Sequence, residues 1–278
     1  MKKCKKEFVK NDEKPFKISH FPIAFCAFFL YNVGDYCGEV VALAEVIGIV
    51  SGKGGMGKTA LTAALAVALA ADGKKVLCVD CDDGRGDLDT YLGFGQLPDL
   101  TYPEVCCGGY PLEQAAIHPK FPKLRFLAAP LGENRTTPEE FAALLRQAKQ
   151  NFDYILLDDP KFRGWVDRWV LIVRPDPAAI RGGRRMADQL ELQGKGNVRL
   201  IVNAIDIKKM VSLAINVDDV MDQVGLPLLG IVPDDWNFTA ACAAGSNLQT
   251  VTQKGAAAAA ERIARRIQGI QTAIPSRL

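Results

Sequence analysis

The residues with the clearest chemistry stand at 51–59, which read Ser-Gly-Lys-Gly-Gly-Met-Gly-Lys-Thr. Gly52, four further residues and then Gly57, Lys58 and Thr59 match the spacing of a phosphate-binding loop. Glycines allow backbone N–H groups to turn toward phosphate oxygens, and a following helix adds the partial positive charge of its N-terminus. In such a loop the lysine contacts the β- and γ-phosphates, and the threonine hydroxyl holds Mg²⁺.

The sequence on either side of the loop supports this interpretation. An apolar run at 46–50 precedes it, and an alanine- and leucine-rich helical pattern at 59–71 follows it. A glycine-rich turn without a ligand does not require this strand–loop–helix context, whereas a nucleotide site does. We therefore predict a nucleoside triphosphate site with Mg²⁺ that uses Gly52, Lys53, Gly54, Gly55, Met56, Gly57, Lys58, Thr59 and Ala60.

Carboxylates follow two other apolar runs. Asp80 and Asp82 come directly after residues 76–79, and Asp158 follows residues 154–157. Open parallel sheets place their chemistry at the carboxyl ends of the strands, so these side chains are expected near the loop. Transfer of a phosphoryl group to water needs carboxylates that hold the metal and a group that positions the nucleophile. A polar turn at the strand end is the alternative for Asp80 and Asp82, since Asp82-Asp83-Gly84 is favourable turn sequence.

The second lysine of the loop, Lys53, indicates a particular family. Gly-Lys-Gly-Gly-x-Gly-Lys-Thr is the deviant form of the loop, and residues 45–270 resemble the MinD/ParA family of ATPases. The resemblance implies that Lys53 reaches across a homodimer interface to the nucleotide of the partner. The alternative for Lys53 is a solvent-facing loop lysine.

The resemblance also implies roles for residues outside the loop, with ATP as the nucleotide. Asp82 would orient the attacking water as a catalytic residue alongside Lys53 and Lys58. Thr59, Asp80, Asp82 and Asp158 would surround Mg²⁺, with Asp158 acting through a water molecule. Asn203, which follows the apolar run at 199–202, would read the adenine edge. The segment 231–235 resembles the family's loop over adenine, with Pro233 and Asp234 in contact with the base.

The residues after Asp82 separate the branches of the family. The Asp-Pro-Gln-Gly sequence of plasmid-partition members is absent, whereas Leu88-Asp89 and Leu92-Gly93 look more like the MinD branch. This implies an ATPase that dimerises on binding ATP, responds to an effector protein and acts in spatial regulation such as division-site placement. A DNA- or organelle-positioning ATPase of ParA type, and an ATP-sensing binding module with weak hydrolysis, remain as alternatives.

Two departures from the family pattern bear on turnover, and a third, at Gly182, makes the surface of the basic segment 161–185 unusually positive. Asp87 stands where the MinD branch usually has asparagine, and a carboxylate near the γ-phosphate adds like charge. Only about ten residues separate Asp158 from Trp169, which leaves no room for the usual crossover helix. Gly182 stands where an acidic residue is common.

Basic residues are frequent in the segment 161–185. Contacts with DNA or anionic lipid are one interpretation of this segment, and a solvated helix face is the one we favour. The residues concerned are Lys161, Arg163, Arg168, Arg174, Arg181, Arg184 and Arg185.

Beyond these residues, the alternation of apolar runs with helical patterns predicts a doubly wound α/β fold with a mostly parallel sheet, as in P-loop NTPases. Strands are expected near 46–50, 76–79, 124–128, 154–157, 169–173, 201–203 and 228–232. Helices are expected at 59–71, 138–150, 177–192, 216–224 and 256–267, with short helices within 101–117.

Length and charge are consistent with one ATPase domain at 45–278. The chain has 278 residues, 49% of them hydrophobic, and a formal net charge of +2, so no global field points to nucleic acid. Eight cysteines in a chain with a nucleotide site indicate reduced thiols and a cytoplasmic location. Cys78, Cys81, Cys106 and Cys107 lack the spacing of a shared metal site and are expected to be packing thiols.

Both ends of the chain depart from the central domain. Residues 1–44 form a lysine-rich and then aromatic extension that imitates a signal peptide. Two interpretations stay open: the segment is not part of the native protein and Val41 is encoded by a GUG start codon, or the aromatic run at 21–31 is a short membrane-surface anchor. Ile263, Ile267, Ile270 and Ile274 form a helically spaced stripe that we assign to core packing. A peripheral position at the inner face of the plasma membrane, or on DNA, therefore stays open.

Overall fold

The computed structural model describes residues 43–83, 86–96, 98–162, 164–194 and 196–273, which belong to one compact unit, 42–278. The predictions for the extension at 1–44, including Val41 and the aromatic run, and for Arg163 and Ile274 fall outside the described residues, apart from Leu43 and Ala44. Within the described part of the chain, no helix is both long and apolar enough to cross a membrane.

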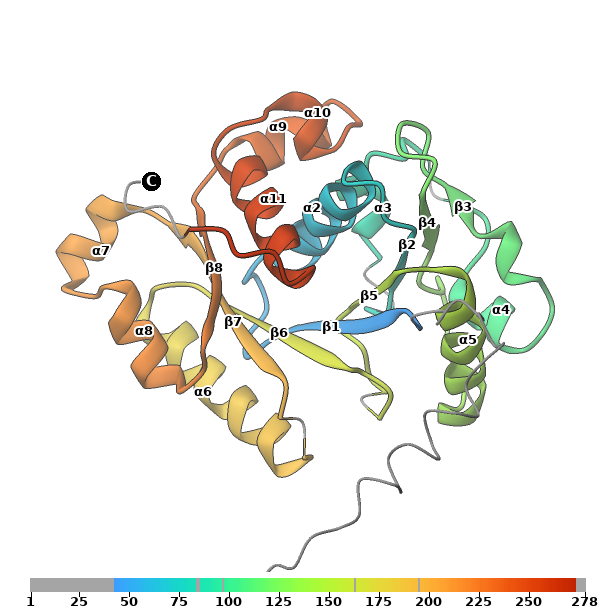
Figure 1. The fold of residues 1–278 in the computed structure, drawn as a ribbon, viewed down its shortest axis with the longest axis horizontal. Coiled ribbons are helices and arrows are strands. Elements are labelled where there is room, and N and C mark those ends of the chain that lie inside the picture. The colour runs from blue at the N-terminus through green and yellow to red at the C-terminus, as the bar shows by residue number, and fades with distance from the viewer. Residues whose placement is uncertain (1–42, 84–85, 97, 163, 195, 274–278) are drawn as a thin grey trace, which may run out of the picture. The chain divides into compact units, whose positions relative to one another are not determined.

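The unit is built on a single eight-stranded sheet (Figure 1) with the order β3-β4-β2-β5-β1-β6-β7-β8. All neighbouring strands run parallel except β3 and β4. The strands are β1 (Glu45–Ser51), β2 (Val76–Asp80), β3 (Ala116–Ile117), β4 (Leu124–Leu127), β5 (Tyr154–Asp158), β6 (Arg168–Val173), β7 (Val198–Ile205) and β8 (Leu228–Pro233).

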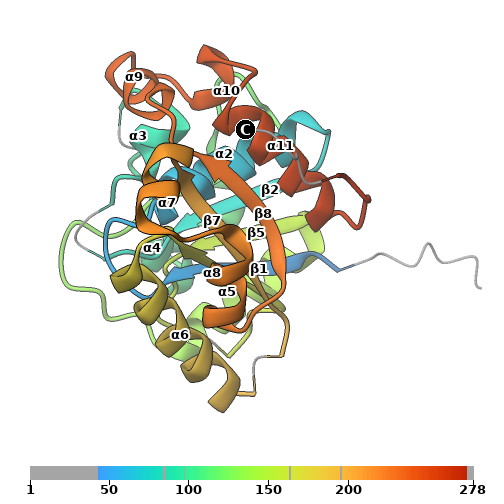
Figure 2. The same cartoon turned by 90° about the vertical axis from the view of Figure 1, so that its left-hand side faces the viewer.

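Helices cover both faces of this sheet, as Figures 1 and 2 show. One face carries α2 (Lys58–Ala71), α3 (Leu88–Leu92), α9 (Asn237–Ala243), α10 (Leu248–Val251) and α11 (Ala256–Ile267). The other face carries α5 (Pro138–Asn151), α6 (Pro177–Leu192) and α8 (Val217–Val224). The remaining helices are α4 (Tyr102–Cys106), the 3₁₀ helix η1 (Leu112–Gln114) and α7 (Ile207–Leu213).

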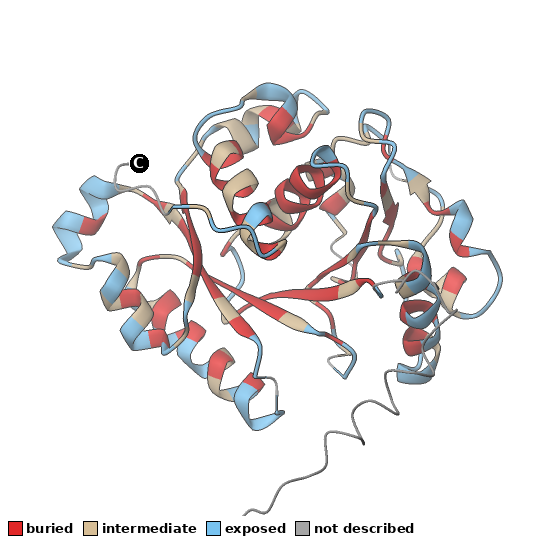
Figure 3. Cartoon of the chain, viewed as in Figure 1, coloured by how far each residue is buried: buried red, intermediate tan, exposed pale blue. Residues whose placement is uncertain are grey.

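The central strands are buried on both faces (Figure 3), which is why they appear in the sequence as unbroken apolar runs. The doubly wound fold is therefore confirmed. The short helices expected within 101–117 are α4 and η1, and the short strand β3 that follows them was not predicted. One predicted boundary was wrong, because β7 continues past Asn203 to Ile205. Its backbone is irregular there, because Ala204 has a positive φ of 53° and the pairing with β8 shifts register.

The C-terminal stripe packs into the core where it is helical. Ile263 and Ile267 on α11 are 1% and 2% exposed, whereas Ile270 beyond the helix is 50% exposed. The assignment of Ile263 and Ile267 to core packing is confirmed.

Candidate functional site

The glycine-rich loop connects the central strand β1 to α2, at the carboxyl edge of the sheet. Gly57 is the N-cap residue of α2, with φ 90°, and no side chain caps the helix. The first turn of α2 also has no acidic residue. The first N–H groups of α2 are therefore free to bind an anion, which the partial positive charge of the helix end favours.

Close backbone contacts explain two of the glycines. A Cβ atom on Gly52 would lie 2.0 Å from the carbonyl carbon of Gly182 in α6. A Cβ atom on Gly57 would lie 2.4 Å from Nδ2 of Asn203. By contrast, Gly54 and Gly55 have no other group within 4 Å of such an atom. The loop thus packs against β7 and α6 on one side and is open on the other, as a phosphate-binding loop must be.

Asn203 supports the loop directly. Its side chain is buried, with Nδ2 donating to the carbonyl oxygen of Met56 at 2.8 Å. The sequence predicts this residue as an adenine contact, and the structure gives it a bond to the loop's main chain. The predicted base loop is adjacent, since the Asp234 N–H donates to the Ile205 carbonyl at 2.9 Å. Pro233 lies at the end of β8.

The predicted metal side of the site also assembles. Asp158 ends β5 and is 1% exposed. Its Oδ1 accepts a hydrogen bond from Thr62 Oγ1 at 3.0 Å, whereas its buried Oδ2 has no hydrogen-bond partner within the described part of the chain. An unpartnered buried carboxylate oxygen is costly unless something binds it. Mg²⁺ commonly binds one or two carboxylates together with substrate phosphates, so Thr59, Asp80 and Asp158 fit its donor set.

Asp80 lies beside Asp158 because the two residues are in register on adjacent parallel strands. Burial, and next the charge of Asp158, raise the pKa of Asp80 to about 7. Burial raises the pKa of Asp158 to about 6, while hydrogen bonds from Thr59 and Thr62 and the charge of Lys58 oppose the rise. Two buried carboxylates that ionise with difficulty form a site that a divalent cation would stabilise.

The side chains of the two loop lysines have different surroundings. Lys58 Nζ lies 3.3 Å from Oδ2 of Asp159, a contact that no sequence pattern had indicated. Lys53 is exposed, and its ammonium group has no hydrogen-bond or ion-pair partner among the described residues. The Lys53 carbonyl instead accepts a 2.6 Å hydrogen bond from Ser51 Oγ, which shapes the loop.

Asp82 and Asp83 follow β2 with distinct environments. The Asp82 N–H donates to Oδ1 of Asp80 at 3.1 Å, which positions Asp82 at the edge of the site, half-buried. Asp83 accepts hydrogen bonds from Tyr102 Oη at 3.1 Å, Asn134 Nδ2 at 2.8 Å and Lys161 Nζ. Sequence reasoning treated Asp83 only as a turn residue, because these partners come from distant segments. Asp87, the family departure, is exposed just before α3.

Comparison with known proteins identifies the family. The model of the CobQ/CobB/MinD/ParA nucleotide-binding domain matches residues 47–248. The chain belongs to the MinD/ParA family. The septum site-determining protein MinD of Synechocystis sp. is 35% identical over 241 residues, which span 81% of this chain and 90% of the relative.

Solved MinD structures agree with this assignment. The Aquifex aeolicus MinC:MinD cell division protein complex matches with a TM-score of 0.76 and 31% identity, covering 84% of this chain and 99% of that one. The Pyrococcus horikoshii MinD structure with Mg-ADP matches with a TM-score of 0.70 and 24% identity, over 81% and 96% of the two chains, and supports the fold. The predicted family is confirmed, and these relatives and structures are MinD proteins.

The described residues of the predicted basic segment, which exclude Arg163, lie in different surroundings. Arg168 pairs with Glu45 at 2.8 Å at the amino end of its strand, and Lys161 pairs with Asp83. Arg184 pairs with Asp188 at 2.8 Å within α6. Among the described residues of the segment, Arg174, Arg181 and Arg185 form no ion pair.

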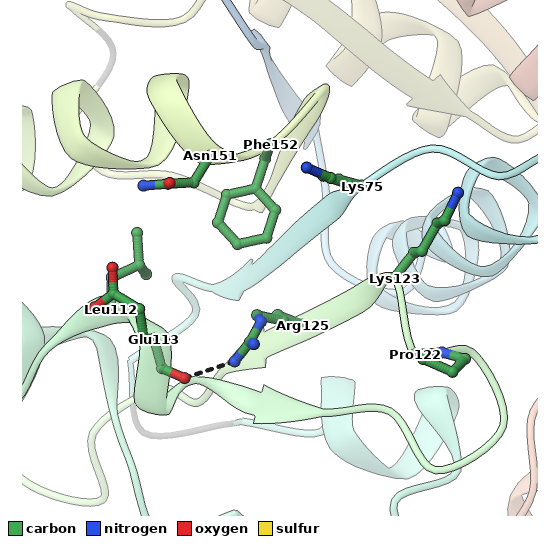
Figure 4. Close-up of a pocket in the computed structure, with 8 residues that line it drawn as sticks. All are labelled: Lys75, Leu112, Glu113, Pro122, Lys123, Arg125, Asn151 and Phe152. Carbon is green, nitrogen blue, oxygen red and sulfur yellow. Dashed lines mark hydrogen bonds between the residues drawn. The ribbon is translucent and has the colours of Figure 1, made fainter.

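A separate cavity of about 300 Å³ lies at the opposite edge of the sheet, where β2 and β4 begin (Figure 4). Two of its three cations are committed to main-chain carbonyls. Lys123 Nζ donates to Gly73 at 2.7 Å, and Arg125 Nη1 donates to Glu113 at 2.6 Å. Lys75 is the third cation that lines the cavity. The cavity belongs neither to the loop nor to its carboxylates.

Proposed function

We propose that this chain is a MinD-type ATPase, a switch that dimerises on binding ATP and takes part in division-site placement. The observation that carries the proposal is the open glycine loop with Lys53 exposed on it, joined to the uncapped N-terminus of α2. The septum site-determining relatives, which match over most of the chain, supply the biological setting.

The chain's own groups account for nucleotide binding. Loop and α2 N–H groups would bind the phosphates, with Lys58 at the β- and γ-phosphates. Thr59, Asp80 and Asp158 would hold Mg²⁺, which supplies charge neutralisation when it is bound. Asp82 would orient the attacking water. Asn203 fixes the loop through Met56, and it lies two residues before Ile205, which pairs with Pro233 and accepts a hydrogen bond from the Asp234 N–H, so the segment suits a contact with adenine.

Dimerisation would follow from Lys53. Its free ammonium group on an open loop could reach the nucleotide of a second subunit, so that ATP holds two copies together and hydrolysis releases them. The solved Aquifex complex pairs MinD with MinC, and an effector protein of that kind is the expected partner here. The cytoplasm is the expected location, with peripheral binding at the inner face of the plasma membrane left to experiment.

The test combines nucleotide binding with dimerisation. Lys58→Ala should lower the affinity for ATP at least about 100-fold, because the phosphate charge loses its principal partner. Lys53→Ala should retain nucleotide affinity within about threefold but lose the ATP-dependent increase in mass measured by light scattering. Normal ATP binding by Lys58→Ala would refute the site, and normal dimerisation of Lys53→Ala would refute the role given to Lys53.

One observation favours a ParA-like alternative. Arg181 and Arg185 on α6 are exposed, and neither side chain has a partner in the described residues. Retention of the ATP-bound protein on DNA that falls steeply with salt would support this function, because phosphate contacts release counterions. Retention on anionic vesicles and not on DNA would favour the MinD type.

A further inference from the structure

Asp159 has an unusual conformation and an unusual neighbour. Its φ of 51° lies in the left-handed region, which few residues other than glycine, asparagine and aspartate occupy. The Asp159 N–H donates to the Ile49 carbonyl at 2.9 Å, so the turn after β5 is tied to the central strand β1. This turn directs the carboxylate to Lys58 Nζ at 3.3 Å, with the side chains 36% and 14% exposed.

The ammonium group in this contact is that of Lys58, the lysine that binds the β- and γ-phosphates in a phosphate-binding loop. In this structure that charge already has a carboxylate partner. A bound nucleotide must therefore either displace Asp159 or place its phosphates close to it. Asp158, with its unpartnered Oδ2, adds a second carboxylate from the preceding residue.

The carboxylate of Asp159 should affect the binding of ATP and of ADP unequally. ATP carries a γ-phosphate with additional negative charge that ADP lacks, and like charges a few ångströms apart at a partly buried site repel measurably. The cost of a carboxylate at Lys58 should therefore be larger for ATP than for ADP.

We propose that Asp159 is a specificity-determining residue that lowers the affinity of this site for ATP relative to ADP. The proposal rests on the proposed nucleotide function and deepens it. Its consequence is that the ATP-bound state forms at a higher ratio of ATP to ADP than it would with a neutral residue at this position.

The test measures dissociation constants of ATP and ADP with Mg²⁺ by titration calorimetry. Asp159→Asn is the informative variant, because asparagine tolerates the left-handed backbone and removes only the charge. The expected gain is about five- to tenfold for ATP and about twofold for ADP. Asp188→Asn is the matched control, since it removes one carboxylate from another ion pair, that with Arg184, and should change neither constant.

The outcomes separate the two proposals. If the wild-type protein binds neither nucleotide, the nucleotide function itself is refuted. If the wild-type protein binds nucleotide and Asp159→Asn leaves the ATP-to-ADP ratio unchanged, the role of Asp159 is refuted while the function stands. Weaker ATP binding by Asp159→Asn also refutes it and would make Asp159 a ligand of the magnesium–nucleotide complex. Unfolding curves for each variant ensure that folded protein is compared.

Discussion

At the scale of single residues, Asp80 and Asp158 are a buried pair of like charge. Both have a pKa above the usual value of a carboxyl group, so each binds a proton more tightly in the folded protein than in the unfolded chain. In the window from about pH 4 to pH 7 the folded state therefore holds more protons. The contribution of this pair to the free energy of unfolding therefore falls as the pH rises through that window, when no divalent cation is present.

Asp80→Asn should reduce this dependence on pH. The variant lacks the Asp80 titration, so its stability should fall less than that of the wild type between pH 5 and pH 8, by roughly 3 kcal/mol. Urea denaturation at both pH values without divalent cations measures the difference. His118, whose pKa is lowered mainly by burial, acts in the opposite direction but is present in both proteins. An equal change in the free energy of unfolding between pH 5 and pH 8 in the two proteins would contradict the prediction.

Gly52 offers a second residue-scale prediction. Gly52→Ala places a methyl group 2.0 Å from the Gly182 main chain, so the loop or α6 must move, at a cost of about 1–3 kcal/mol or more. Gly54→Ala adds the same atom where nothing lies within 4 Å and should change stability by less than about 0.5 kcal/mol. Thermal or urea unfolding compares the pair, and equal destabilisation by both would show that the contact is unimportant.

At the scale of elements, Asp83 joins three segments at the nucleotide edge of the sheet. It lies after β2, its partner Asn134 lies between β4 and α5, and Lys161 follows β5. Tyr102 at the start of α4 completes the network. The segments that carry Asp82 and Asp159 are thus held together through one carboxylate that is only 10% exposed.

Asp83→Ala should therefore destabilise the protein by about 1–3 kcal/mol, because it removes the acceptor of the buried Tyr102 hydroxyl and of the half-buried Asn134 amide. The exposed pair of Arg135 with Glu133 provides the control, since their side chains are 83% and 74% exposed. Glu133→Ala should change stability by less than about 0.5 kcal/mol. Urea denaturation distinguishes the two variants. If Asp83→Ala lowers the free energy of unfolding no more than Glu133→Ala does, the network does not stabilise the protein more than an exposed ion pair.

At the scale of the whole molecule, the sequence predicted the layers better than the contacts. Strands β1, β5 and β6 are apolar without interruption because helices cover both their faces, so composition alone located them. Helices α5 and α6 were predicted close to their observed bounds, and in the structure Thr137 and Asp176 cap them ahead of a proline. The short helices α3, α7, α9 and α10 were missed, since four to seven residues show too little periodicity.

In the candidate site, too, the sequence predicted the positions of residues better than the contacts between them. The loop, Asp80 and Asp158 could be predicted, because a fixed spacing or a strand end places them. The pairing of Lys58 with Asp159 and the bond from Asn203 to Met56 join segments separated by about a hundred residues or more. No local pattern encodes such contacts, since they depend on how distant strands come into register.

The strand order has a consequence for synthesis on the ribosome. β1 is the first strand of the described part of the chain to be made, yet its partners β5 and β6 lie more than a hundred residues later. At about 5–20 residues per second, β1 would wait roughly 5–20 s for a neighbour. Throughout that interval a strongly apolar segment would be exposed to aggregation or to chaperones. The strand that carries the nucleotide loop is therefore also the nascent chain's most vulnerable segment in the described part of the protein.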